Sequence, residues 1–98
     1  MQNHFRKTRL ANAYNKPAVA ERLWGRSVAI KYIQRVDMIA AAPDVGHLRS
    51  LRTFRFHALK GNRAGTFGID FTGNLRLVVT FVESDNLSII LEVVDYHG

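Results

Sequence analysis

TFGIDFTGNLRLVVTFV, residues 66–82, is the stretch that decides the fold predicted for this chain. Side chains alternate between apolar and polar or small along both halves of it, a period of two that is typical of strands with one buried face. The residues TGN, 72–74, separate the halves and are typical of a hairpin turn. The stretch therefore predicts two antiparallel strands with a shared apolar face. The apolar members are Phe67, Ile69, Phe71, Leu75, Leu77, Val79 and Phe81.

Two further strands are predicted on either side of this hairpin. In RTFRFHA, residues 52–58, Phe54 and Phe56 alternate with Arg55 and His57. The residues ESDN, 83–86, predict a turn into LSIILEVVDYHG, residues 87–98. Alternation there predicts one shared side for four apolar residues, and the whole region then forms a four-strand antiparallel meander. These four are Leu87, Ile89, Leu91 and Val93.

The region before the meander predicts a short strand at Asn3–Arg6 and then helices. A first helical piece is expected over Thr8–Tyr14, and a longer helical pattern runs from Pro17 to Pro43 with a possible break at Gly25. Asp44 is suited to cap a short helical turn through VGHLRS, residues 45–50. The fold class expected is α+β: a short strand, two to three helices on one sheet face, and the meander, in a single domain over residues 1–98.

Composition narrows the class of protein. All 14 Lys and Arg lie at or before Arg76, together with four of the eight acids, and the residues after Arg76 hold only acids among the charged types. A basic body favours a polyanionic partner such as RNA, DNA or the ribosome, because neutralised phosphates release counterions. Cysteine is absent, and no apolar run is long enough to cross a bilayer. We expect a cytoplasmic protein without a membrane partner.

Strand alternation also predicts the polar face of the sheet. If the Phe and Leu sets face the helices, the opposite face carries a histidine, cations and acids, with Gly68 leaving room beside them. A histidine and an arginine on one open face suit an RNA-cleaving site, but an ordinary solvated sheet face has the same pattern. The residues placed there are Arg55, His57, Gly68, Asp70, Arg76, Thr80 and Glu92.

Three blocks of sequence resemble the HigB branch of the RelE/ParE toxin superfamily of bacterial toxin-antitoxin systems. They are HALKGNRAGTFGI (residues 57–69), GNLRLVVTF (73–81) and EVVDYH (92–97), and AIKYIQRVDMI (29–39) resembles a subgroup more weakly. The resemblance implies a RelE-like, microbial-RNase-like sandwich and a metal-independent mRNA interferase that cuts mRNA on the ribosome. It also implies a HigA-like helix-turn-helix antitoxin as partner, with operator DNA bound only through the complex, and no cofactor or metal.

The resemblance carries over residue by residue to a candidate catalytic set. In it, two imidazoles share the acid and base roles in attack by the RNA 2′-hydroxyl, without an order being assigned. Cationic side chains stabilise the phosphate, the terminal acid orients an imidazole, and the terminal tyrosine stacks on a base or donates a hydrogen bond. The catalytic candidates are His57, Lys60, Arg76, Asp95, Tyr96 and His97, and the RNA-binding candidates are Arg55 and Arg63.

The sequence departs from the family pattern at several positions, and other functions fit it as well. The family often has other residues where this chain has Ala58, Asn62, Phe67 and Leu75, and Gly98 extends past the terminal histidine. A solvated turn explains Lys60 equally and is the favoured interpretation of Arg63. The rival functions are a non-catalytic ParE-like gyrase inhibitor and a degenerate RNA- or antitoxin-binding module.

Overall fold

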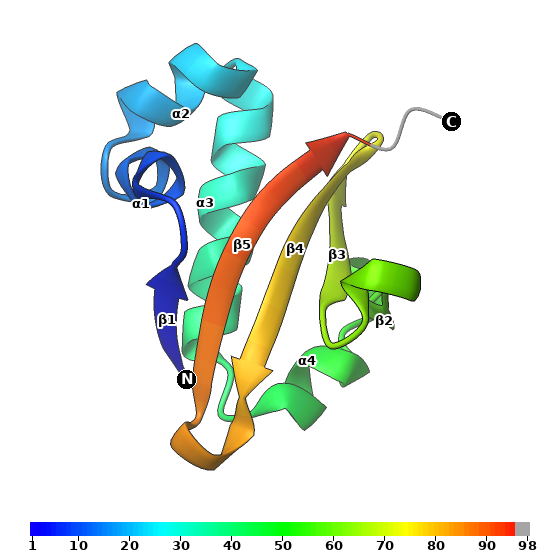
Figure 1. The fold of residues 1–98 in the computed structure, drawn as a ribbon. Helices are drawn as coiled ribbons and strands as arrows, with labels where there is room; N and C mark the ends of the chain where they lie inside the picture. Colours follow the sequence, from blue (N-terminus) through cyan, green and yellow to red (C-terminus); the bar gives the residue numbers. More distant parts are fainter. Residues whose placement is uncertain (96–98) are drawn as a thin grey trace.

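The computed structural model describes residues 1–95, which form one mixed sheet with helices on one face (Figure 1). The strand order is β1-β5-β4-β3-β2. The strands are β1 (Gln2–Phe5), β2 (His57–Ala58), β3 (Phe67–Thr72), β4 (Leu75–Val82) and β5 (Leu87–Asp95). The helices are α1 (Thr8–Asn15), α2 (Pro17–Trp24), α3 (Arg26–Ala41) and α4 (Val45–Ser50), with 3₁₀ turns η1 (Arg52–Phe54), η2 (Gly61–Arg63) and η3 (Glu83–Asp85).

The helix boundaries follow the local signals in the sequence. Pro17 occupies the first turn of α2, where its missing N–H costs nothing. Gly25 separates α2 from α3 with φ 84°, a left-handed conformation that glycine adopts readily, so the predicted break is confirmed. Asp44 Oδ1 accepts a 2.9 Å hydrogen bond from the His47 amide and caps α4 as predicted. No helix within residues 1–95 is long and apolar enough to span a membrane.

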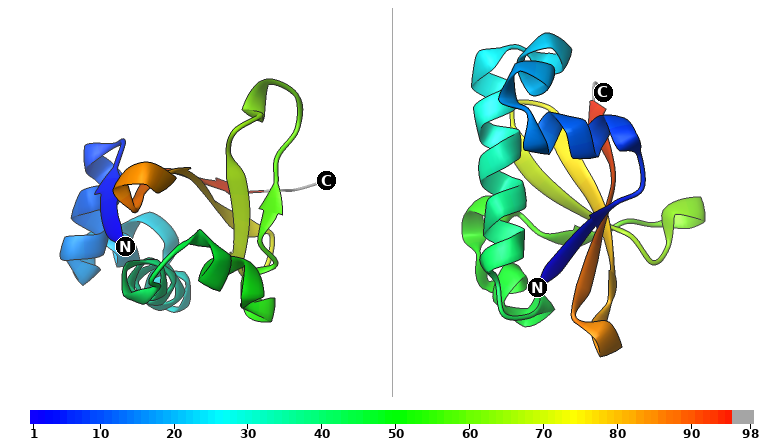
Figure 2. Two further views of the ribbon diagram at one scale, coloured as in Figure 1. Left: turned by 90° about the horizontal axis from the view of Figure 1, so that it is seen from below. Right: turned by 90° about the vertical axis from the view of Figure 1, so that its left-hand side faces the viewer.

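The core lies between α3 and the sheet. Views from two further directions show α3 running along one face of the sheet, while the other face carries no α-helix, only the loop that contains η2 (Figure 2). The helix contributes Tyr32, Val36 and Ile39, each with no exposed surface. They belong to one buried cluster with the inward residues of the strands, which include Ile69, Leu77, Val79 and Ile90.

A parallel pair adds an edge to the predicted meander. Strands β2 to β5 are antiparallel neighbours as expected, and β1 then pairs in parallel with β5. Asn3 fixes this edge, since its Nδ2 donates to Val36 O of α3 at 3.0 Å and its Oδ1 accepts from the buried Ser88 hydroxyl. The result is a five-strand sheet in which β1 contacts both α3 and β5 and so connects the helix layer to the last strand.

The strand predicted over residues 52–58 is largely wrong. Arg52–Phe54 form a 3₁₀ turn, Arg55 has left-handed backbone angles (φ 46°, ψ 46°), and only His57–Ala58 pair with β3. Phe54 is fully buried, and Phe56 stacks on Phe67 with ring centroids 5.0 Å apart. Phe54 and the half-buried Phe56 thus both pack on the core, as alternation predicted, but the chain between them is a turn and not extended strand.

The predicted facing of β5 is also partly wrong. The register between β4 and β5 shifts between Val78 and Val79, so that Val79 pairs with Ile90 while Leu77 still pairs with Val93. Directly paired residues share a face, and this bulge therefore turns Ile90 inward and leaves Ile89 opposite Thr80 on the other face. Simple alternation had placed Ile89 and Leu91 with Val93 on the helix side.

Replacement of Tyr32 by phenylalanine tests the core. The Tyr32 hydroxyl donates to Leu10 O at 2.8 Å inside the helix layer, and burial raises the pKa of this phenol, which keeps it a donor. Tyr32→Phe leaves that carbonyl without its donor, and we expect a loss of about 1–3 kcal/mol in unfolding free energy by urea titration. The control Tyr14→Phe, which removes an exposed bond to Asp37, should cost less than about 1 kcal/mol.

Candidate active site

The helix-free face of the sheet carries a cluster of polar side chains beneath a folded-back loop. The loop over residues 59–66, which contains η2, is tied to the strands of this face by two contacts. Thr80 Oγ1 donates to Gly65 O at 2.9 Å, and an Arg63 nitrogen pairs with Glu92 Oε1 at 3.1 Å. The loop projects from the sheet on the side away from α3 (Figure 2). The loop and the strands thus enclose one end of the open face.

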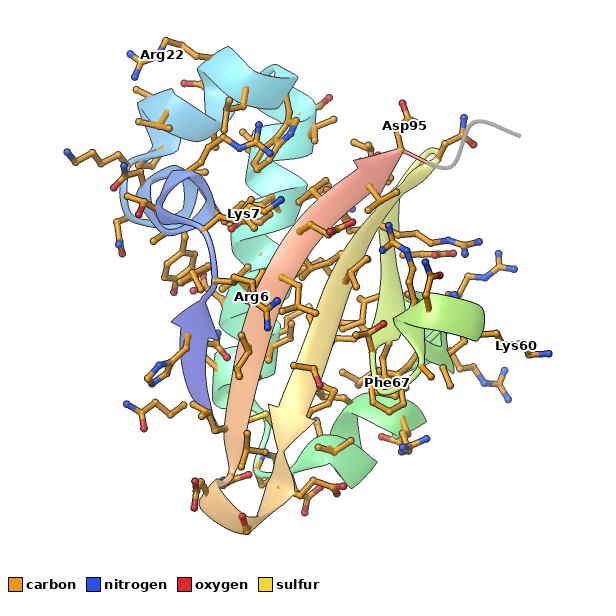
Figure 3. The ribbon with its side chains drawn as sticks, viewed as in Figure 1. Arg6, Lys7, Arg22, Lys60, Phe67 and Asp95 are labelled. Atoms are coloured by element: carbon orange, nitrogen blue, oxygen red, sulfur yellow. The ribbon has the colours of Figure 1, made fainter. Side chains whose placement is uncertain are left out.

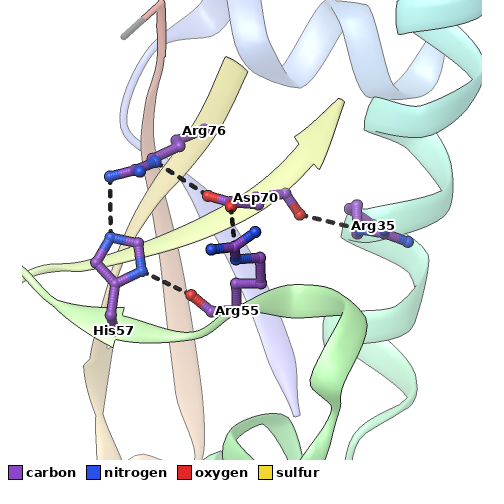
Figure 4. A network of polar contacts seen from close by, with 5 residues as sticks. All are labelled: Arg35, Arg55, His57, Asp70 and Arg76. Atoms are coloured by element: carbon purple, nitrogen blue, oxygen red, sulfur yellow. Dashed lines mark hydrogen bonds and ion pairs between the residues drawn. The ribbon is translucent and has the colours of Figure 1, made fainter. Parts of the chain in front are cut away.

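His57 is held by both ring nitrogens (Figure 4). Nδ1 lies 2.6 Å from Arg55 O, and Nε2 lies 3.1 Å from an Arg76 guanidinium nitrogen. A carbonyl oxygen only accepts and a guanidinium only donates, so the contacts require a neutral ring with its proton on Nδ1. The Nε2 lone pair, the atom that can take a proton, therefore points to Arg76.

Gly68 supplies the space that the imidazole occupies. His57 and Gly68 are cross-strand partners on β2 and β3. A Cβ atom added at Gly68 would lie 2.9 Å from both Cε1 and Nε2 of the ring, closer than carbon atoms approach in proteins. The absence of a side chain at this position lets the end of the ring lie over Gly68, within reach of Arg76.

Asp70 joins the arginines around the imidazole. It pairs with Arg76 across the β3–β4 hairpin, with Arg76 Nε 3.0 Å from Oδ1, and Arg55 Nε lies 3.4 Å from Oδ2. Its main-chain oxygen accepts from Arg35 Nε of α3 at 3.4 Å. The Asp70 carboxylate thus pairs with two guanidinium groups while its backbone carbonyl accepts from a third, and the cluster keeps an excess of positive charge suited to a phosphate.

The other predicted site residues lie at different distances from this cluster. Lys60 precedes η2, is exposed, and points away from the sheet (Figure 3). Arg63 pairs with Glu92 on the same face as His57. Asp95 ends β5 opposite Leu75, next to the Arg76–Val94 pair, so the last described residue of β5 lies at the end of β4 that carries Arg76. Tyr96 and His97 lie outside the described residues.

Asp70 and Arg35 are the residues that sequence analysis left without a role. Alternation placed Asp70 on the open face, and its position opposite Arg76 across a short hairpin was the available signal. Arg35 carried no such signal, because it reaches Asp70 from the helix layer. Among residues 1–95, no group of three His, Asp or Glu side chains is placed to hold a metal ion.

Substitution of Gly68 by alanine tests the placement of the ring. The added methyl collides with the end of a side chain and not with the backbone, so His57 can swing away at small cost. We expect Gly68→Ala to change the unfolding free energy by less than about 1 kcal/mol. A crystal structure of the variant should show Nε2 displaced from Arg76, and an unmoved ring would contradict this account.

Comparisons with known proteins place the fold. No protein-family model matches the sequence, and no curated protein sequence matches it either. Solved structures do match over almost the whole chain. The YoeB-YefM complex from Staphylococcus aureus aligns at a TM-score of 0.63 and 17% identity, covering 100% of this chain and 98% of its own.

Two further structures agree with this result. The YoeB/ParE toxin from Agrobacterium tumefaciens gives a TM-score of 0.63 and 17% identity, with 99% of this chain and 100% of its own covered. The toxin-antitoxin complex RelBE2 from Mycobacterium tuberculosis gives 0.50 and 21%, with 94% and 93% covered. At these identities the likeness concerns the backbone alone. The chain has the RelE/YoeB-like toxin fold.

Proposed function

We propose that this protein is a HigB-like toxin of a type II toxin-antitoxin system, a ribosome-dependent endoribonuclease that cuts mRNA and arrests translation. The observation that carries the proposal is the contact of neutral His57 with Arg76 on the open face. The toxin fold supports it, as do the three sequence blocks that resemble the HigB branch. Because one fold can host several functions, the nuclease proposal depends mainly on the residues of the site.

The chemistry asks little of the protein, since RNA supplies its own nucleophile. A base removes the 2′-hydroxyl proton, the 2′-oxygen bonds to phosphorus, and the bond from phosphorus to the 5′-oxygen breaks. The leaving oxygen then takes a proton from an acid. Positive side chains offset the charge that develops on the phosphate, and loss of such a group commonly costs about 10²- to 10³-fold in rate.

The tautomer of His57 favours the base role for this residue. Its Nε2 lone pair lies on the open face, where it accepts from Arg76, whereas its protonated Nδ1 is occupied by Arg55 O. We therefore assign the base to His57 and the acid to His97, with Asp95 and Tyr96 at the tail orienting the acid and contacting a base of the RNA. Arg76, Lys60 and Arg55 contact the phosphates, and Arg63 shapes the loop through Glu92.

The proposed partners follow from the same assignment. One of the similar structures is the toxin-antitoxin complex RelBE2 and another is the YoeB-YefM complex, which supports an antitoxin as partner. We propose a HigA-like antitoxin, the ribosome and mRNA as partners in the cytoplasm, with operator DNA reached only through the toxin-antitoxin complex. The net charge of +6 supports binding to the phosphate-rich ribosome.

Inducible expression in bacteria with transcript-end mapping tests the activity. The wild-type chain should arrest growth and produce discrete in-frame mRNA ends, because cleavage takes place on translating ribosomes. His57→Ala and His97→Ala should each lose the cuts, since each removes a proton-transfer group. His47→Ala is the matched control, because this exposed histidine lies on α4 outside the site, and it should cut as the wild type does.

Other outcomes separate the rival functions. Growth arrest with DNA damage and intact transcripts would indicate a ParE-like gyrase inhibitor. Antitoxin binding without arrest or cuts would indicate a degenerate module. Cuts that persist in both His57→Ala and His97→Ala would remove the histidine assignment while leaving a nuclease.

Lys60→Ala tests the outward lysine in the loop. Because its ammonium is exposed, its removal should leave the unfolding free energy almost unchanged. We expect cleavage of ribosome-bound mRNA to fall by about 10- to 100-fold, since a phosphate-stabilising charge is lost. Lys31→Ala, which removes an equally exposed lysine on α3, should retain full activity. Equal rates for the two variants would assign Lys60 to the solvated surface.

A further inference from the structure

Asp70 is connected to both nitrogens of the candidate base without touching it. The Arg76 guanidinium that pairs with Asp70 Oδ1 through Nε also contacts His57 Nε2 through a second nitrogen. Arg55, whose Nε pairs with Oδ2, supplies through its main-chain oxygen the contact to Nδ1. The two residues that bracket the imidazole therefore share one carboxylate (Figure 4).

The burial of these groups gives the arrangement rigidity. The Asp70 side chain is 27% exposed and that of Arg76 is 33% exposed, whereas Arg55 is 77% exposed. Water screens the Arg76 pair less than the Arg55 pair, so Asp70 holds Arg76 more firmly. The Arg35 bond to Asp70 O further ties this point of β3 to α3.

The contact between Arg76 and His57 Nε2 conflicts with the base role of His57. A base must offer its Nε2 lone pair to the 2′-hydroxyl, yet in the structure that lone pair accepts from Arg76. A bound phosphate can resolve the conflict, because an anionic phosphate oxygen attracts the Arg76 guanidinium as a full charge, whereas the uncharged Nε2 lone pair offers only a dipole. Arg76 then needs an anchor that keeps it near the site while it exchanges one partner for the other.

We infer that Asp70 is a positioning residue that anchors Arg76, so that the substrate phosphate draws the guanidinium off His57 Nε2 and frees the base only when RNA is bound. The inference rests on the proposed nuclease function. Without substrate, Asp70 holds Arg76 against Nε2, which leaves the ring proton on Nδ1 facing Arg55 O. With substrate, the same anchor limits Arg76 to a swing about its Nε, and the freed Nε2 takes the 2′-hydroxyl proton.

Ring nitrogen NMR tests the anchor without any activity. Two-bond ¹H–¹⁵N spectra at a pH where the imidazoles are neutral should show wild-type His57 protonated on Nδ1. Asp70→Asn removes the charge that holds Arg76, and the ring signals should move toward a mixture of both tautomers. Asp37→Asn, an exposed aspartate beside Tyr14, is the matched control and should leave them unchanged. Arg76→Lys is a second variant. Its ring signals should also move toward a mixture of tautomers, because a single ammonium nitrogen cannot replace the two guanidinium nitrogens that contact Asp70 and His57.

Single-turnover cleavage of ribosome-bound mRNA tests the role. Asp70→Asn should slow the cleavage step by about 10- to 100-fold with little change in the toxin concentration for half-saturation, because positioning and not binding is lost. Asp70→Glu should recover part of the rate.

The outcomes separate this inference from the proposed function. An unshifted His57 ring in folded Asp70→Asn, or full cleavage by that variant, overturns the anchor. If the wild-type chain cuts no RNA, the nuclease proposal fails, while the ring spectra still decide whether Asp70 controls the state of His57.

Discussion

The burial of one face of the β3–β4 hairpin against α3 is the constraint on which this structure depends. Ile69, Leu77 and Val79 are fully buried there, and burial of a side chain of this size contributes about 1.5–3 kcal/mol. Side chains alternate along a strand, so this choice of inner face places Asp70 and Arg76 on the outer one. A slip of one residue in either strand would turn that strand's charge toward the core, which makes the register that pairs Asp70 with Arg76 strongly specified.

Two local backbone irregularities, at Arg55 and in the β4–β5 pairing, position polar groups on the open face. The left-handed backbone at Arg55, which costs about 1–2 kcal/mol for a residue with a side chain, brings the Arg55 carbonyl to His57 Nδ1. The rings of Phe54 and Phe56, packed on the helix side, offset that cost. The bulge in β5 leaves Glu92 opposite Val78 on the open face, where Arg63 of the loop reaches it. Both irregularities serve the face that α3 does not cover.

The polar cluster on the open face is more closely connected than the charges of an ordinary solvated sheet face. Solvated faces carry charges that are exposed and loosely paired, whereas here an imidazole is bracketed on both nitrogens and a mostly buried carboxylate links two guanidinium groups. The likeness to YoeB and RelE toxins, at 17–21% identity, concerns the backbone. The chemistry proposed for this chain therefore depends on His57, Arg76 and Asp70, and on a tail that lies beyond the described residues.

Sequence alone determined the features that neighbouring residues encode: the hairpin at 66–82, the helix break at Gly25, the Asp44 cap, and the open face that unites His57 with Arg76. Only the tertiary structure decided the turn at Arg55, the bulge that reverses Ile89 and Ile90, the parallel β1–β5 pair, and the reach of Arg35 to Asp70. The reason is physical. Periodicity and caps arise from contacts a few residues apart, whereas the second group depends on how aromatic rings and layers distant in sequence fill the same space.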